Sequence, residues 1–117
     1  MNDAPATPVT IETRGFAVVA RAQKKMMDDD EMKAMSQLVD KAASAEPGIT
    51  LVVLDLSPVR IVPSLALGLL VQMSQKCRAR QQRLKLAGVQ PQVRQVFSVT
   101  RLDRLFEFAE SVEAAVE

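Results

Sequence analysis

The chain contains no histidine, and this absence removes several classes of chemistry at once. Histidine is the commonest general base and metal ligand, and every Ser–His or Cys–His nucleophile depends on it. The single cysteine, Cys77, can neither close an internal disulfide nor form a metal site alone. The four glycines are isolated, so they do not make a phosphate-binding loop. We therefore expect a protein that is not an enzyme and that needs no cofactor, metal or small-molecule substrate.

Long apolar runs and an excess of one charge are also missing. No apolar run approaches the roughly 18 residues that span a bilayer, and the first seven residues lack the pattern of a signal peptide. Fifteen Lys and Arg against fourteen Asp and Glu leave a formal charge of +1, which gives no global field for nucleic acid or acidic membranes. These features predict a cytoplasmic protein that neither binds nucleic acid nor inserts into a membrane.

What the sequence does contain is enough apolar material for one core. The 117 residues fit a single domain, and 48% of them are hydrophobic. With four Phe and no Tyr or Trp, the core must be built from Leu, Val, Ile, Met and Ala. Residues 1–8, which carry two prolines, are expected to form a flexible tail before one domain over residues 9–117.

The apolar pattern switches between the periods of strands and helices. Strands are predicted at Val9–Thr13, Phe16–Ala20, Ile49–Leu54, Leu84–Val89 and Leu105–Phe108, with a hairpin turn at Arg14-Gly15. Helices are predicted from Asp28 to before Pro47, from Pro63-Ser64 to about Arg80, from Pro91, and after a Ser111 cap. This order predicts an α/β domain with a mixed sheet of four to five strands, an N-terminal hairpin and about four helices packed mainly on one face.

One stretch of the sequence resembles the signature of STAS domains, a family named for sulfate transporters and anti-sigma-factor antagonists: LVVLDLSPVRIVPSLALGLLVQM. In that family a buried strand ends in Asp-Leu-Ser, and after a short connection a helix opens with Asp-Ser-Ser-Gly-Leu-Gly. A later stretch resembles the family's second half: LKLAGVQPQVRQVFSVTRLDRLFEFAESVEAAV. The resemblance covers about Val9 to Val116 and implies a single STAS-like domain.

The resemblance also implies a site at the opening of the second helix. The family's serine phosphoacceptor falls on Ser64, and its acidic residue before the first helix is matched by Asp28, with Asp29 next to it. Around Ser64 the chain has its own residues, with Pro63 in place of the family's Asp and Leu65 in place of its second Ser. The partner-binding surface implied in this way comprises Asp28, Asp29, Pro63, Ser64, Leu65, Leu67 and Gly68.

Each of these features also has a purely structural interpretation. Serine is a favoured N-cap, so Ser64 alone predicts a helix cap, which is compatible with phosphorylation at the same place. Asp28 and Glu31 have the spacing of a capping pair at an acidic helix start. A basic cluster, formed by Lys76, Arg78, Arg80, Arg83 and Lys85, lacks the aromatic platforms of a nucleic-acid site and is interpreted as a solvated helix end.

Two functions follow from the resemblance. The first is a bacterial anti-sigma factor antagonist, which binds an anti-sigma factor of the serine-kinase type while unphosphorylated and is switched off by phosphorylation at Ser64. The alternative is a non-switching scaffold or subunit of a larger assembly, such as a stress-signalling or lipid-transport complex. Pro63 beside the serine favours the alternative.

Overall fold

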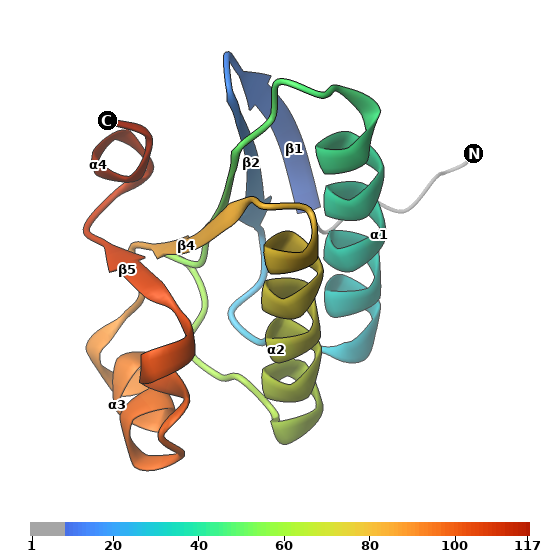
Figure 1. Ribbon diagram of the computed structural model, residues 1–117. Helices are drawn as coiled ribbons and strands as arrows, with labels where there is room; N and C mark the ends of the chain where they lie inside the picture. The colour runs from blue at the N-terminus through green and yellow to red at the C-terminus, as the bar shows by residue number, and fades with distance from the viewer. Residues whose placement is uncertain (1–8) are drawn as a thin grey trace.

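The computed structural model describes residues 9–117, so the expected tail over residues 1–8 lies outside the described residues. Five strands form one sheet in the order β1-β2-β3-β4-β5 (Figure 1). Their bounds are β1 Val9–Arg14, β2 Ala17–Ala22, β3 Leu51–Asp55, β4 Arg83–Ala87 and β5 Glu107–Ala109. β1 pairs antiparallel with β2, and the other neighbours pair parallel. The predicted N-terminal hairpin and mixed sheet are therefore confirmed.

Four α-helices cover the two faces of this sheet unequally. They are α1 Asp29–Ala45, α2 Ser64–Ala79, α3 Pro91–Val99 and α4 Val112–Val116, and a 3-10 turn, η1, covers Leu102–Leu105. Side chains of α1, α2 and α3 share the larger core, whereas α4 packs in a smaller core on the opposite face (Figure 1). Among the helices of residues 9–117, none combines the length and apolar character needed to cross a membrane.

The central strand β3 is buried on both faces, as its unbroken apolar run predicts. Val52 and Leu54 point into the larger core, and Leu51 and Val53 point into the smaller one. The alternation of side chains along a strand explains why one short segment serves two cores. β3 is thus the strand around which both layers are assembled.

Most strand boundaries differ by one or two residues from those predicted, and the starts of the second and last strands show why. Phe16, expected to open the second strand, lies in the hairpin turn and is 49% exposed, because Ala17 is the residue that pairs with Arg14. Gly15 supplies the positive φ of 55° that the turn needs. At the other end, Leu105 closes η1 and the last strand begins only at Glu107, so the predicted strand starts two residues too early.

Candidate functional site

Ser64 is the first residue of α2 and is exposed to solvent. The cap position belongs to Pro63, whose extended backbone (φ −62°, ψ 159°) ends in a carbonyl that accepts a hydrogen bond from the Leu67 amide at 3.1 Å. No side chain caps this helix end, so the prediction that Ser64 is the N-cap is wrong by one position. The Ser64 hydroxyl is consequently not used as the cap of its own helix.

Two loops that are far apart in the sequence meet beside Ser64. One is the β2–α1 loop, residues 23–28, and the other is the β3–α2 connection, residues 56–63. Met26 and Ile61 form an isolated parallel β-bridge between them. The Lys25 carbonyl accepts hydrogen bonds from the Arg60 amide (2.6 Å) and the Ile61 amide (3.0 Å), and the Met27 amide donates to the Ile61 carbonyl (3.1 Å). These backbone bonds fix the two loops against each other.

The paired loops enclose a shallow depression of about 480 Å³ at the start of α2. The depression is lined by residues of both segments: Met26, Asp28, Asp29, Asp30 and Pro63. The acidic start of α1 and the residue before α2 thus line one depression, although the rest of α1 and the whole of β3 lie between them in the sequence. The spatial proximity that the family resemblance implies for Asp28, Asp29 and Pro63 is present in the fold.

The surface around Ser64 is unusually apolar for an exposed helix start. Large exposed apolar side chains number six in residues 9–117, and three of them lie here: Met26 (43% exposed), Ile61 (56%) and Leu65 (55%). Gly68 is also exposed, one turn along α2. Leu67, in contrast, is only 8% exposed and packs into the larger core. It anchors α2 to the sheet and is not part of the exposed surface. We call Met26, Ile61, Ser64, Leu65 and Gly68 the docking surface.

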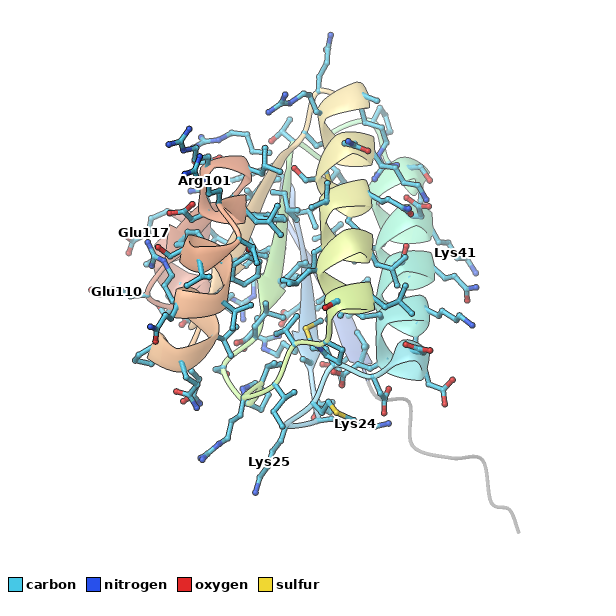
Figure 2. All side chains as sticks on the ribbon, turned by 90° about the horizontal axis from the view of Figure 1, so that it is seen from below. Lys24, Lys25, Lys41, Arg101, Glu110 and Glu117 are labelled. Atoms are coloured by element: carbon cyan, nitrogen blue, oxygen red, sulfur yellow. The ribbon has the colours of Figure 1, made fainter. Side chains whose placement is uncertain are left out.

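Charged side chains of both signs border the docking surface. Asp28 is the N-cap of α1, and its carboxylate accepts hydrogen bonds from the Glu31 amide and from Lys24 Nζ, each at 2.9 Å. The amide bond first, and Lys24 second, hold the pKa of Asp28 below its ordinary value. Figure 2 shows Lys24 and Lys25 projecting from this end of the molecule. The docking surface is therefore an apolar patch with acidic side chains on one side and lysines at its edge.

The predicted capping pair of Asp28 and Glu31 is only half formed. Asp28 caps Glu31 as predicted, but the Glu31 carboxylate turns inward, is fully buried, and accepts hydrogen bonds from the amides of Gln23 and Lys24. Burial raises the pKa of Glu31 above its ordinary value, and the two amide bonds offset this in part. The sequence carried a signal for this burial, because Glu31 stands one turn before the core residue Met35 on the same helix face.

The other candidates have structural roles. The basic cluster is dispersed: Lys76 and Arg80 bind Asp40, Arg83 binds Glu107, and Lys85 donates to the Ala115 carbonyl on the opposite face of the sheet. Cys77 is buried, and this burial raises the pKa of its thiol. Residues 9–117 hold no group of three His, Cys, Asp or Glu side chains arranged for a metal ion. The docking surface is thus the site that the fold assembles.

Comparison with known protein families identifies the fold over nearly the whole chain. A model of the STAS domain family matches residues 9–115. The chain belongs to the STAS domain family. In this STAS domain, Ser64 lies at the exposed start of α2. No protein with a curated description matches it by sequence.

Several solved structures share the fold of this STAS domain. An anti-sigma factor antagonist from Mycobacterium paratuberculosis is 20% identical, with a TM-score of 0.74 over 92% of this chain and 89% of that one. The anti-sigma factor antagonist SpoIIAA in its unphosphorylated form is 20% identical, with a TM-score of 0.74 over 91% of each chain. Bacillus SpoIIAA in its phosphorylated form is 20% identical, with a TM-score of 0.69 over 91% of this chain and 95% of that one.

Proposed function

We propose that this STAS domain is a bacterial, cytoplasmic anti-sigma factor antagonist. In this role it is a binding module rather than an enzyme, and its partner is an anti-sigma factor that is itself a serine kinase. The partner docks on the docking surface and is released when Ser64 is phosphorylated. One observation carries the proposal: an exposed serine that caps no helix stands among exposed apolar side chains, next to the acidic start of α1. The similarity in fold to anti-sigma factor antagonists supports the choice of an anti-sigma factor as partner.

A phosphate on Ser64 would change docking without unfolding the domain. It adds roughly −1.5 to −2 charges and three acceptor oxygens. The start of α2 tolerates that charge, because helix N-termini carry unpaired amides and the positive end of the helix dipole. A partner packed over Met26, Ile61 and Leu65 would have to desolvate the phosphate, at a high cost in free energy. The carboxylates at residues 28–30 make the same region still more negative.

One observation favours the alternative of a non-switching scaffold. Pro63 and Leu65 flank Ser64 on both sides, so no acidic side chain adjoins the serine in the chain. Pro63 itself lines the depression, and Leu65 is exposed, which extends the apolar patch. A constitutive partner in a larger assembly would use the same patch without requiring phosphorylation.

Phosphorylation by a partner kinase separates the two functions. Incubation with candidate serine-kinase anti-sigma factors and ATP should add one phosphate to the wild-type chain and none to Ser64→Ala, measured by intact mass. With ADP bound, the kinase cannot transfer a phosphate, so its affinity for the domain can be measured by calorimetry. Ser64→Asp should lower this affinity at least about tenfold, since even a single charge must be desolvated on binding. Ser98→Ala, at an exposed serine of α3, is the matched control and should behave as wild type.

Two outcomes together would contradict the phosphorylation switch. A wild-type chain that stays unmodified with every such kinase, and a Ser64→Asp variant that keeps full affinity for a co-purifying partner, would contradict the switch. The scaffold function would then remain for the same surface.

A further inference from the structure

Glu31 is an acidic residue with no exposed surface in the folded domain. Acidic side chains are almost never fully buried unless they are paired. Both hydrogen bonds to the Glu31 side chain end on one oxygen, Oε2, which accepts from the Gln23 amide at 3.1 Å and the Lys24 amide at 3.2 Å. The other oxygen, Oε1, has no hydrogen-bond partner among residues 9–117. The carboxylate is therefore removed from water, and its hydrogen bonds go to a single segment, the start of the β2–α1 loop.

The bonds of Glu31 complete a closed ring of three residues. Glu31 accepts from the Lys24 amide, Lys24 Nζ donates to Asp28 Oδ2, and Asp28 Oδ1 accepts from the Glu31 amide. The ring fixes both ends of the β2–α1 loop to the first turn of α1. Between Lys24 and Asp28 lie the Lys25 carbonyl and the Met27 amide, whose hydrogen bonds to Arg60 and Ile61 form the bridge of Met26 with Ile61.

Stability alone does not explain a carboxylate at this position. An ionised group taken out of water costs several kcal/mol unless it is fully paired, and a well-packed apolar side chain in its place is often neutral or stabilising. The neighbouring inward positions of α1 are filled by Met32 and Met35, which are as completely buried as Glu31. The raised pKa of Glu31 reflects the same desolvation. What the carboxylate adds over a methionine is the pair of bonds to the loop.

We propose that Glu31 is a positioning residue of the docking surface, because it holds the loop over residues 23–28 in the place where Met26 pairs with Ile61 beside Ser64. The use of that surface by a partner rests on the proposed function, whereas the positioning itself does not. Within residues 9–117 no hydrogen bond joins Glu31 to Ser64 or to the apolar patch, and Glu31 acts through the backbone of Gln23 and Lys24.

Amide hydrogen exchange on the isolated domain tests the positioning. In Glu31→Leu, the amides of Met27 and Ile61, which bond across the two loops, should exchange at least about tenfold faster, since loops with few buried contacts open locally. The thermal midpoint should be unchanged or higher, because a buried charge is removed. Glu31→Gln should restore slow exchange to within about threefold of wild type, because a single amide oxygen can accept both bonds that now end on Oε2.

A second buried polar residue provides the matched control. Gln82 is 8% exposed and donates through Nε2 to the carbonyls of Ala43 and Ile49, away from the loop. Gln82→Leu should leave exchange at Met27 and Ile61 as in wild type. If Glu31→Leu does not fold, Glu31→Met, which matches its helix neighbours, replaces it.

Two results would overturn the inference: slow exchange at Met27 and Ile61 in Glu31→Leu, or faster exchange that is equal across the whole sheet. Because exchange is measured without a partner, it decides the positioning role even if no anti-sigma factor binds. Where one does bind, its affinity should fall in Glu31→Leu and return in Glu31→Gln.

Discussion

Ser64 is a residue whose side chain its own helix does not require. The cap position is held by Pro63, and the hydroxyl is exposed at the first turn of α2. A serine that caps a helix gives up a hydrogen bond worth roughly 1 kcal/mol when it is modified or replaced. Ser64 has no such bond to lose, so modification can alter the surface while leaving the free energy of unfolding almost unchanged.

Substitutions at two glycines, Gly68 and Gly88, should change the free energy of unfolding in opposite directions. Gly68 is exposed within α2, and a methyl group there would meet nothing within 4 Å, so Gly68→Ala should raise the free energy of unfolding by about 0.5–1 kcal/mol. Gly88 has φ +68°, and its added Cβ would lie 3.0 Å from Ser57 Cβ, so Gly88→Ala should lower it by more than about 1 kcal/mol. Urea unfolding checks both values.

Gly68→Ala has a further expected effect at the docking surface. Because the residue is exposed one turn from Ser64, an added methyl group should weaken partner binding even as it stabilises the fold. A Gly68→Ala variant with wild-type affinity would show that the partner does not approach α2 at this position.

At the scale of elements, α1 and α2 are joined by an ion-pair cluster at the end opposite the docking surface. Asp40 of α1 accepts hydrogen bonds from Lys76 Nζ at 3.0 Å and from Arg80 at 3.1 Å. Partial burial would raise the pKa of Asp40, but the bonds from Lys76 and Arg80 outweigh it and hold the pKa below its ordinary value. A depressed carboxyl pKa stabilises the fold above the unfolded pKa, and this contribution is lost as the pH falls through the folded pKa.

Asp40→Asn should therefore destabilise the domain in a pH-dependent way. We expect a loss of roughly 0.5–1 kcal/mol at pH 7, because the cluster is partly solvent-exposed and screened. The difference from wild type should shrink towards zero at a pH low enough to protonate Asp40 in the folded as well as the unfolded state. Urea unfolding at the two pH values measures it, and a difference that does not depend on pH would contradict the ion-pair explanation.

The elements themselves could largely be predicted from the sequence, because each one depends on local signals. Pro91 opens α3, Ser111 caps α4 through the Ala114 amide at 3.1 Å, and α1 ends before Pro47. Local signals fail where contacts between distant segments decide the outcome. The bridge between Met26 and Ile61 leaves no periodic trace, since both residues lie outside regular strands.

The candidate site was predicted less completely than the fold, for the same physical reason. The resemblance placed Ser64, Asp28 and Pro63, but it also included Leu67, which the packing of α2 buries. Met27 follows an exposed neighbour in the sequence, yet it is fully buried where the β2–α1 loop packs into the larger core. Burial of this kind depends on how a loop returns to the core, which a helical or strand period does not encode.

At the scale of the whole molecule, one face of the sheet depends on a single short helix. The smaller core is closed by Val112 and Ala115 of α4 over Val19 and Val53 of the sheet. Val112→Asp would place an unpaired carboxylate in this core, so we expect it to lower the free energy of unfolding by at least about 2 kcal/mol. A drop in thermal midpoint measures this effect.

The neighbouring residue of α4 gives the control. Glu113 has a largely exposed side chain, so Glu113→Ala should leave the midpoint close to that of wild type. A Val112→Asp variant as stable as Glu113→Ala would mean that the second core contributes little to the fold.

The bridge between Met26 and Ile61 has a consequence for any enzyme that modifies Ser64. Kinases that read an extended stretch of substrate need several residues on each side of the acceptor to be free. Here the stretch before Ser64 is fastened to another loop, and the stretch after it is wound into a helix whose Ala66 and Leu67 are buried. An enzyme that modified Ser64 would therefore have to recognise a folded shape, and an isolated peptide spanning Ser64 would be a poor substitute for the intact domain.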